Sequence, residues 1–300
     1  MLADPKCPIV TILTPTYNRR AFLPETIESV LGQDYPNIEY LILDDGSSDD
    51  TAELVEQYGN SVRYLRHDNM GETKTVNKGF ALASGDIVCV VNSDDPLYSD
   101  QAVSLAVASL VANPEASMTY PDWVSIDAQS RVLRRMRLPD YTLQNMLEDA
   151  NVTIGPGMFI RRTAIKKIGL RDTTIKYTGD LDYSFRLAAS GKIIHIPKFL
   201  ATHREHGASA SNTCQGADMA REIARLGYVY TDQPGTPEVV RKRRHRILGK
   251  WHFIALDYTG NDRQAFREHI KQSFSYSPML FCWFYLLRLL SRVKKCIFSR

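Results

Sequence analysis

The chain has 300 residues, of which 44% are hydrophobic and 24% are charged, so it carries enough apolar side chains for one large α/β domain or a domain with an appendage. This composition excludes a disordered, collagenous or fibrous protein. The net charge of +3 hides a division along the chain. Residues 241–300 carry 14 Lys or Arg against 3 Asp or Glu, whereas residues 1–240 are acidic, so we expect the C-terminal part to meet an anionic partner.

The five cysteines are scattered and form no CxxC pair, which argues against a zinc ribbon or a disulfide framework and favours a reducing compartment. No apolar stretch follows a basic start, so a secretory signal is not expected. The longest apolar run of the C-terminal region, residues 279–287, is shorter than the roughly 20 residues of a bilayer span. We therefore expect a cytoplasmic protein.

Strand and helix patterns alternate four times in the first third of the chain. β-Branched and apolar runs predict strands at 9–14, 38–43, 62–65 and 87–91. Pro15 is expected to end the first of them. Apolar residues at helical spacing predict helices at 22–31, 51–58, 73–83 and 102–111. This alternation predicts an α/β fold, with a mostly parallel sheet and helices on both faces.

The rest of the chain is less regular. Residues 116–212 mix short strands with loops and one clear helix at 181–189, and from about residue 213 the pattern is helical. His195 lies in an apolar strand pattern, which favours a strand residue with its hydrogen bonds satisfied over a ligand. The sequence therefore predicts a sheet-containing body followed by a helical C-terminal extension.

Acidic loops follow two of the predicted strands. Asp44-Asp45-Gly46 follows the second strand, and Asn92-Ser93-Asp94-Asp95 follows the fourth. Ligands of open α/β sheets bind at the carboxyl ends of strands. Clustered carboxylates repel one another unless a cation joins them, and Mg²⁺ or Mn²⁺ takes oxygen ligands that it shares with phosphates. Each pair alone is equally well explained as a turn or helix cap, but their joint position favours a metal and phosphate site.

No glycine-rich phosphate loop is present. Neither GxxxxGK[ST] nor GxGxxG follows the first strand, so the negative charge of a phosphate would be neutralised by a metal together with basic side chains. The basic candidates are Arg66, Lys74, Lys78, Arg204 and His206. Tyr17 follows the first strand, where it would either stack on a base ring or serve as an ordinary half-buried aromatic residue.

Several segments, in the same order along the chain, resemble the motifs of the family 2 inverting glycosyltransferases, whose fold is called GT-A. They are residues 10–18, 42–49 with 69–71, 77–86 with 92–95, 179–187, and 204–206 with Ser209 and Ser211. The resemblance covers about residues 9–212. It implies a nucleotide-binding half at 1–115 and an acceptor-binding half at 116–212, followed by a helical, basic extension at 213–300.

The resemblance also implies roles for particular residues. The nucleotide-sugar would be bound by Pro15, Tyr17, Asp45, Asn92, Asp94 and Arg204, and Lys74 joins them as a basic candidate. Pro15 and Tyr17 would line the base, from which Asp45 would accept a hydrogen bond. Mn²⁺ or Mg²⁺ would be held by Asp94, Asp95 and His206. Asp180 takes the place of the general base.

Two positions depart from the family pattern. Asn92 stands at the first position of the Asp-x-Asp motif, and Gly179 stands where many relatives have Glu, which leaves Asp182 as a second candidate base. Asp180 is favoured because it lies at a helix start, where its side chain projects into a cleft. Asp182 lies inside the first turn, where a carboxylate is stabilised by the helix dipole for structural reasons alone.

The resulting hypothesis is an inverting glycosyltransferase of polysaccharide or glycoconjugate biosynthesis. It would move a sugar from a nucleotide diphosphate, UDP being the nucleotide that the resemblance favours, to a hydroxyl of a saccharide or lipid-linked acceptor. One general base and no protein nucleophile predict a single displacement, hence inversion. A nucleotidyltransferase would need a glycine-rich opening loop with a lysine, which residues 14–20 lack. A nucleotide-sugar binding subunit without turnover stays open because of Asn92 and Gly179.

The basic C-terminal region has two interpretations. Residues 279–290, followed by Arg292, Lys294, Lys295 and Arg300, fit a helix lying on an anionic membrane surface, here the inner face of the cytoplasmic membrane. They equally fit a last helix packed on the protein itself. The basic run 241–246 is typical of a solvated helix face or of a site for lipid head groups. Nucleic acid is not expected as a partner, because the body is acidic.

Overall fold

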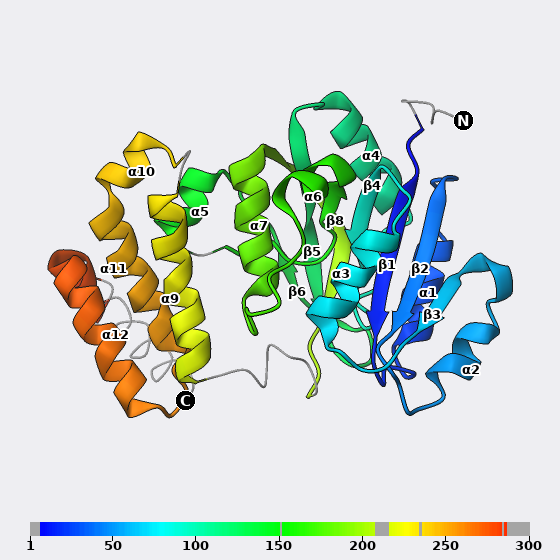
Figure 1. The fold of residues 1–300 in the computed structure, drawn as a ribbon, viewed down its shortest axis with the longest axis horizontal. Helices are drawn as coiled ribbons and strands as arrows, with labels where there is room; N and C mark the ends of the chain where they lie inside the picture. Colours follow the sequence, from blue (N-terminus) through cyan, green and yellow to red (C-terminus); the bar gives the residue numbers. More distant parts are fainter. Residues whose placement is uncertain (1–6, 151, 208–215, 234–235, 284, 287–300) are drawn as a thin grey trace. The chain divides into compact units, whose positions relative to one another are not determined.

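The computed structural model describes residues 7–150, 152–207, 216–233, 236–283 and 285–286. The chain divides into two compact units (Figure 1). The first unit contains Met1–Thr142, Thr153–Thr174 and Arg186–Ser209, and the second contains Leu143–Val152, Ile175–Phe185 and Ala210–Arg300. Helix α7 (Gly179–Ser190) contributes residues to both units.

The first unit is built around one eight-stranded sheet, with the strand order β3-β2-β1-β4-β7-β5-β6 and with β8 paired to β5. Its strands are β1 (Val10–Thr16), β2 (Ile38–Asp44), β3 (Arg63–Arg66), β4 (Ile87–Val90), β5 (Ala116–Ile126), β6 (Val132–Met136), β7 (Phe159–Arg161) and β8 (Lys192–Arg204). Strands β1 to β4 pair in parallel, as predicted. Strand β7 is antiparallel to both β4 and β5, and β6 is antiparallel to β5, so the second half of the sheet is mixed.

Strand β1 continues through Pro15, so the prediction that this proline ends the strand is wrong. The backbone N–H and C=O groups of successive β1 residues point alternately toward β4 and toward β2. The carbonyl of Leu13 accepts the Val91 amide beyond β4, and the carbonyl of Thr16 accepts the Asp45 amide beyond β2. The backbone of Pro15, two residues after Leu13, therefore points toward the β4 side. There the pairing ends at Leu13, whereas the pairing with β2 runs on to Thr16. The missing amide of the proline breaks no ladder bond at this place.

Helices cover both faces of the parallel half of the sheet, as predicted (Figure 1). On one face, α1 (Leu23–Leu31), α2 (Thr51–Glu56) and α4 (Ala102–Ala112) share a buried apolar cluster with the β1 side chains of Val10 and Ile12. On the other face lies α3 (Glu72–Leu82), so close that a methyl group on Gly79 would collide with Leu13. The alternation of side chains along β1 thus assigns α3 to the opposite face.

The region between 116 and 212 is more regular than expected. Strands β5 and β8 contain 11 and 13 residues and are not short. Helices α5 (Leu143–Asp149) and α6 (Arg162–Ile168) were not predicted, because seven residues span too few turns to show a helical period. Pro121 interrupts the strand pattern of β5, and the register with β8 shifts beside it. His195 is a strand residue of β8, as predicted, and its Nε2 lies 2.8 Å from Asp122.

The second unit is helical, which confirms the predicted helical C-terminal region. It contains α5, α9 (Ala217–Asp232), α10 (Glu238–Lys242), α11 (Arg244–Ala255), the 3₁₀ turn η2 (Leu256–Tyr258) and α12 (Arg263–Tyr276), followed by a helical segment at 278–283. Trp251 is the centre of its core. The indole donates to the carbonyl of Leu147 at 3.0 Å, packs edge-on against Phe185, and lies so close to Gly227 that an added Cβ would meet it at 2.9 Å.

Within the described ranges, no helix combines the length and the apolar character that crossing a bilayer requires. The basic residues that complete the predicted membrane-surface helix, Arg292, Lys294, Lys295 and Arg300, lie outside the described residues. The same holds for Ser209 and Ser211 of the resemblance.

Candidate active site

The loops that follow β1 and β2 are joined by hydrogen bonds at the carboxyl edge of the sheet. The amide of Asn18 donates to Ser47 Oγ at 2.9 Å, and Asn18 Oδ1 accepts the amide of Ser48 at 2.8 Å. Asn18 has a φ of 51°, a left-handed conformation that asparagine tolerates better than most residues. Arg66, at the end of β3, donates to the Ser47 carbonyl at 2.7 Å. Three strand ends are thereby fixed relative to one another.

The two carboxylates that follow β2 hold these loops in place. Asp44 is fully buried and accepts the amide of Ser47 at 2.7 Å and the hydroxyl of Tyr64. Asp45 is also buried, and its two oxygens accept the amides of Met70 at 2.7 Å and Gly71 at 2.9 Å. The predicted hydrogen bond from Asp45 to a nucleotide base stays a prediction, which would use a remaining lone pair of this carboxylate.

The other residues predicted for the base and phosphates differ in exposure. Pro15 is buried inside β1, whereas the Tyr17 side chain beyond it is 48% exposed. Lys74 lies exposed in the first turn of α3, directly after the loop that Asp45 holds. Tyr17 and Lys74 are thus accessible to a ligand at the edge where β1 and β2 end.

In the loop after β4, Asp95 is a buried anchor. Its Oδ1 accepts the backbone amide of Arg204 at 2.7 Å, and its Oδ2 accepts the side-chain amide of Asn92 at 3.0 Å. His203 Nδ1 lies 3.8 Å from the same carboxylate, and this neighbour raises the pKa of His203. Asp95 therefore ties the loop to the end of β8, and its predicted role as a metal ligand stays a prediction.

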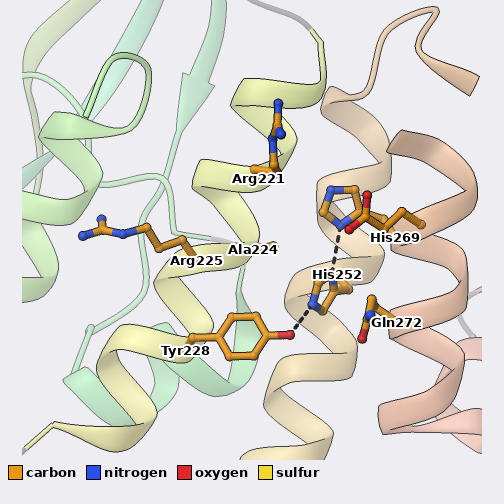
Figure 2. A pocket seen from close by; sticks show the side chains of 8 residues that line it. Arg221, Ala224, Arg225, Tyr228, His252, His269 and Gln272 are labelled. Carbon is orange, nitrogen blue, oxygen red and sulfur yellow. Dashed lines mark hydrogen bonds between the residues drawn. The ribbon is translucent and has the colours of Figure 1, made fainter. Parts of the chain in front are cut away.

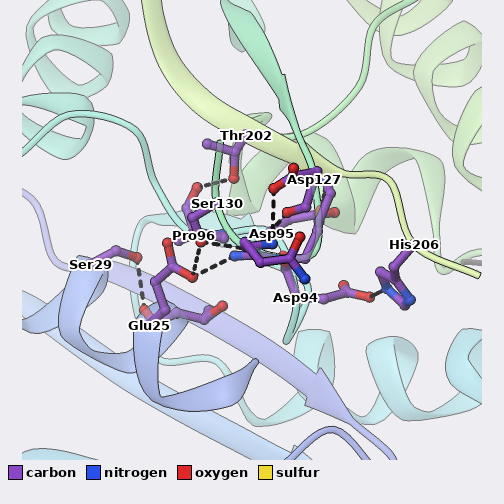
Figure 3. A network of polar contacts seen from close by, with 12 residues as sticks. Glu25, Ser29, Asp94, Asp95, Pro96, Asp127, Ser130, Thr202 and His206 are labelled. Carbon is purple, nitrogen blue, oxygen red and sulfur yellow. Dashed lines mark hydrogen bonds and ion pairs between the residues drawn. The ribbon is translucent and has the colours of Figure 1, made fainter. Parts of the chain in front are cut away.

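Asp94, in contrast, turns toward a histidine and an arginine. Its Oδ2 lies 2.9 Å from Nε2 of His206 (Figure 3). The same oxygen lies 3.5 Å from Nε of Arg19. The Asp94 side chain keeps 18% of its surface exposed and the His206 side chain 7%, while the imidazole ring packs against Phe22 at 4.8 Å between centroids. Two residues that are 112 positions apart in the chain thus meet at the carboxyl edge of the sheet.

Arg204 lies beneath this pair and is 1% exposed. Its guanidinium donates to the carbonyl of Asp94 at 2.8 Å, to Glu25 at 2.6 Å, and to the Asp127 carbonyl and the Ser130 hydroxyl of the β5–β6 turn. The group also stacks on Phe22 at 5.1 Å. These contacts fix the backbone that carries Asp94, and a direct contact of Arg204 with a leaving diphosphate stays a prediction.

The residues available for a metal ion form a pair. Over the described ranges, no group of three or more His, Cys, Asp and Glu side chains is arranged to hold a metal. Asp94 and His206 offer one carboxylate and one imidazole nitrogen, and both are donors that Mn²⁺ accepts. Divalent ions at phosphate sites commonly take one or two carboxylates and complete their shell with substrate phosphates and water. The pair therefore fits an ion that arrives together with a diphosphate.

The two candidate bases lie in the second unit, at the start of α7. The side chain of Asp182 is buried and accepts the hydroxyl of Tyr230 at 2.9 Å, so it belongs to the helical core. Asp180 is exposed. The carboxylate of Glu222 accepts the amides of Lys176, Tyr177 and Thr178 at 2.8–3.0 Å and so fixes the turn that precedes α7. Of the two acids, only Asp180 is accessible to an acceptor.

Several residues of this arrangement were missed from the sequence. Arg19, Glu25 and His203 stand beside motif residues, and Glu222 lies in a helix without any motif. The one available signal was the charge of Arg19, next to the Tyr17-Asn18 motif. The roles of the others depend on contacts between segments that are more than 40 residues apart.

Comparison with known families shows the family to which the chain belongs. Residues 11–169, more than half of its length, match the family described as glycosyl transferase family 2. The chain belongs to this family. The resemblance of its motifs to that family is thereby confirmed, and the chain is a glycosyltransferase.

The curated relatives are moderately similar. An uncharacterised glycosyltransferase of Rickettsia typhi is 28% identical over 216 residues, which cover 69% of this chain and 67% of the relative. The O-antigen biosynthesis protein RfbC of Myxococcus xanthus is 29% identical over 71% of this chain, but the match covers only 17% of that protein. The putative teichuronic acid biosynthesis glycosyltransferase TuaG of Bacillus subtilis is 36% identical over 31% of this chain and 39% of its own length.

Solved structures share the fold. Residues 1–349 of Staphylococcus aureus TarS, in complex with UDP-GlcNAc, match with a TM-score of 0.70 at 17% identity, over 91% of this chain and 82% of the other. The Pyrobaculum calidifontis mannosyltransferase PcManGT, in complex with GDP-Man and Mn²⁺, matches with a TM-score of 0.63 at 15% identity, over 97% and 81%. The glycosyltransferase described above therefore has the predicted GT-A fold.

Proposed function

We propose that this glycosyltransferase moves a sugar from a nucleotide-diphosphate donor, in the first place a UDP-sugar, to a hydroxyl of a saccharide or lipid-linked acceptor, with inversion. The observation that carries the proposal is the meeting of Asp94 and His206 at the carboxyl edge of the sheet, in a chain of family 2. The complexes of TarS with UDP-GlcNAc and of PcManGT with GDP-Man support a nucleotide-sugar as the donor.

On the donor side, Tyr17 stacks on the base, which Pro15 and Asp45 border, and Lys74 and Asn92 contact the rest of the nucleotide. The exposure of Tyr17 and Lys74 supports this arrangement. We assign to Arg204 a positioning role, because its donors hold the Asp94 carbonyl and the neighbouring turn. The positive charge of the buried guanidinium still favours a diphosphate above it.

Asp94 and His206 hold the Mn²⁺ or Mg²⁺ that comes with the donor, with Asp95 behind them. When bound, the ion neutralises the negative charge that develops on the leaving diphosphate. For this task His206 must present an unprotonated nitrogen, and Asp94 must be ionised. The guanidinium of Arg19, whose Nε lies 3.5 Å from Asp94 Oδ2, places a positive charge beside the same carboxylate.

Asp180 acts as the general base. It takes the proton of the acceptor hydroxyl while that oxygen forms a bond to the anomeric carbon, and the bond from this carbon to the diphosphate oxygen breaks. With one base and no protein nucleophile, the sugar undergoes a single displacement, so its configuration inverts. General-base catalysis of this kind contributes about 10²–10⁴-fold to the rate. The exposure of Asp180 and the structural role of Asp182 support the choice between the two acids.

The decisive test of the base is Asp180→Asn. We expect transfer to fall by about 10²–10⁴-fold, while the nucleotide diphosphate still raises the melting temperature as it does for the wild type. Asp149→Asn, an exposed carboxylate of the same unit, serves as the matched control and keeps its activity. Near-normal turnover of Asp180→Asn would contradict the assignment. The anomeric configuration of the product, read by NMR, tests inversion separately.

The metal is tested by calorimetric titration of UDP with and without Mn²⁺. The wild type should bind UDP more tightly with Mn²⁺ than without it, and Asp94→Ala should abolish this difference. Asp127→Ala is the control, because it removes a carboxylate whose described contacts, with Arg131 and the amide of Gln129, lie within the β5–β6 turn, and it keeps the backbone carbonyl that Arg204 contacts. An unchanged Mn²⁺ effect in Asp94→Ala would refute the metal role of this residue.

A second candidate, a nucleotide-sugar binding subunit without turnover, is favoured by one observation. Asn92, which replaces the first acid of the Asp-x-Asp motif, donates its amide to Asp95 and presents no carboxylate to a metal. Hydrolysis of the donor in the absence of acceptor separates the candidates, because a binding subunit would release no nucleotide.

We further infer that the acceptor belongs to cell-surface polysaccharide assembly at the inner face of the cytoplasmic membrane. The names of RfbC and TuaG support the pathway class. In the second unit, Phe274, Met279 and Trp283 are 49%, 84% and 59% exposed, next to exposed basic residues of α12, which supports attachment to an anionic bilayer.

Attachment is tested by sedimentation with lipid vesicles. We expect binding to vesicles containing phosphatidylglycerol, weaker binding to pure phosphatidylcholine, and loss of binding in Met279→Ser/Trp283→Ser. Val132→Ser, an exposed apolar residue of β6 in the other unit, is the matched control. Equal binding of the double variant and the wild type would contradict this inference.

A further inference from the structure

The second unit contains a cavity of about 430 Å³ between α9, α11 and α12, which we call the helical-unit cavity (Figure 2). It is lined by Arg221, Ala224, Arg225, Tyr228, His252, Glu268, His269 and Gln272. Its volume lies in the range of small-molecule sites, about 300–1,000 Å³. None of its lining residues belongs to the family 2 match or to the motifs identified in the sequence.

A chain of hydrogen bonds runs beneath this cavity and sets the proton positions of two histidines. The hydroxyl of Tyr228 donates to that of Tyr276 at 3.2 Å. A hydroxyl has one hydrogen, so Nε2 of His252, 2.7 Å from the Tyr228 oxygen, must be the donor in that pair. Figure 2 shows the two successive contacts, from Tyr228 to His252 and from His252 to His269.

The second histidine is left with a lone pair. Burial and the neighbouring His269 lower the pKa of His252 to about 4, so near neutral pH its Nδ1 is an acceptor. Nδ1 of His269 lies 2.8 Å away and therefore carries the proton of this contact. Burial also lowers the pKa of His269, and a neutral imidazole protonated on Nδ1 carries a lone pair on Nε2.

This lone pair faces the cavity without a partner. His269 is 3% exposed and lines the cavity, and among the residues that the structure describes its Nε2 makes no hydrogen bond. Nε2 of His269 is not among the fully buried side-chain atoms that lack a partner, so it is accessible from the cavity. A ligand that offers a hydrogen-bond donor can therefore bind to it there.

The other polar groups of the cavity select the chemistry of that ligand. The carboxylate of Glu268 and the guanidinium of Arg225 carry opposite charges, and Arg221 is paired with Asp218, so with both histidines neutral these groups give the cavity no net charge and favour a neutral ligand over an anion. Glu268 and Nε2 of His269 accept hydrogen bonds, whereas Gln272 both donates and accepts. Such alternation matches sugar hydroxyls, each of which donates once and accepts as well. The ring of Tyr228 adds an apolar surface for the C–H groups of a sugar.

We propose that the helical-unit cavity binds a neutral sugar residue of a glycan through its hydroxyl groups. One hydroxyl donates to Nε2 of His269, and its neighbours bond to Glu268 and Gln272. The proposal concerns binding alone and does not rest on the proposed transfer reaction. For a glycosyltransferase, a second saccharide site outside the family 2 match would hold a glycan chain near the enzyme between transfers.

The test is a glycan array probed with the full-length protein, followed by calorimetry on each glycan that binds. The variants are His269→Phe, which keeps an aromatic ring but removes the lone pair, and Gln272→Ala, which removes one amide without disturbing the histidine pair. The controls are Asp94→Asn at the strand-end site and Gln57→Ala, an exposed residue at the end of α2 in the first unit. Competition with inorganic phosphate tests an anion as the ligand instead.

We expect at least one neutral glycan whose affinity falls tenfold or more in both cavity variants and stays unchanged in Asp94→Asn and Gln57→Ala. If His269→Phe does not fold, the decision rests on Gln272→Ala. The proposal is overturned if no glycan binds, if bound glycans are lost in Asp94→Asn but kept in Gln272→Ala, or if inorganic phosphate displaces them from the wild type. Failure of transfer in Asp180→Asn leaves these outcomes unaffected.

Discussion

The loops after β2 and β4 both carry two consecutive aspartates, yet their carboxylates behave differently. After β2, Asp44 and Asp45 are buried and accept backbone amides and a tyrosine hydroxyl from their own surroundings. After β4, Asp95 does the same, but Asp94 turns to His206 and Arg19. Asp45 and Asp95 also have histidine neighbours, at 3.5 and 3.8 Å, but their side chains are 6% exposed against 18% for Asp94. Of the four acids, Asp94 is therefore the one most open to a ligand.

This difference shows that an acidic pair at a strand end is not by itself a metal site. A buried carboxylate is stable when amides satisfy its oxygens, and such a carboxylate determines the path of the loop. The acid that remains partly exposed beside a cationic or metal-binding side chain is the one suited to chemistry. Variants of the two loops test this contrast.

The largest effect is expected for Asp94→Asn. The change removes the charge that faces His206 but leaves the contacts of Asp95 intact, so transfer should fall by about 10²–10³-fold, the size expected for one electrostatic group at a reacting phosphate. The melting temperature should change little. Steady-state kinetics together with thermal unfolding check both parts, and a strongly destabilised Asp94→Asn would contradict the division of roles.

Asp95→Ala should show the reverse pattern. It removes the acceptor of the Arg204 amide and of the Asn92 side chain, and hydrogen bonds to charged groups are each worth about 1.5–3 kcal/mol. We expect the free energy of unfolding to fall by about 3 kcal/mol, measured by urea denaturation. Asp94→Ala is the matched control, and equal stability of the two variants would remove the contrast within this loop.

A smaller effect is expected at Gly46, in the loop after β2. Its φ is +80°, and an added Cβ would lie 2.9 Å from the amide nitrogen of Asn69. Gly46→Ala should therefore cost about 1–2 kcal/mol of unfolding free energy from the left-handed backbone alone, and more from the close contact. Gly59→Ala, at φ +52° with no atom within 4 Å, separates the two contributions, because only the backbone term applies there.

The smallest effect concerns pH. Asp95 raises the pKa of His203 above its ordinary value of 6.5, so the folded state holds this proton more tightly than the unfolded chain does. The resulting stability is fully present below pH 6.5 and is lost as the pH rises through the folded-state pKa. The melting temperature of the wild type should exceed that of His203→Gln at pH 5.5 and approach it at pH 8.5. A difference that grows with pH would contradict the ion pair.

The sequence predicted the parallel half of the sheet well, because β1, β2 and β4 are short apolar runs that end in turn residues. It failed at Pro15, where the outcome depends on how far the neighbouring strand extends. It also missed α5 and α6, which are too short to show a period. Local patterns thus predict elements, whereas pairing lengths decide their ends.

For the candidate site, the motif residues Asp94 and His206 were identified from the sequence and lie together. The division of labour between Asp94 and Asp95 was not predictable, since both have the same chemistry and adjacent positions. The difference is that Asp95 accepts the backbone amide of Arg204, which lies in β8, 109 residues further along the chain. Contacts of this kind arise only when the sheet is assembled.

The guanidinium of Arg204 connects three distant segments: the first turn of α1 through Glu25, the Asp94 loop, and the β5–β6 turn through Asp127 and Ser130. Moving any one of these segments away removes at least one hydrogen-bond partner from a buried cation, which is costly. They should therefore open as a single cooperative unit, and their amides should exchange with solvent hydrogen at similar rates. Local unfolding of the Asp94 loop would then be accompanied by faster amide exchange in the first turn of α1.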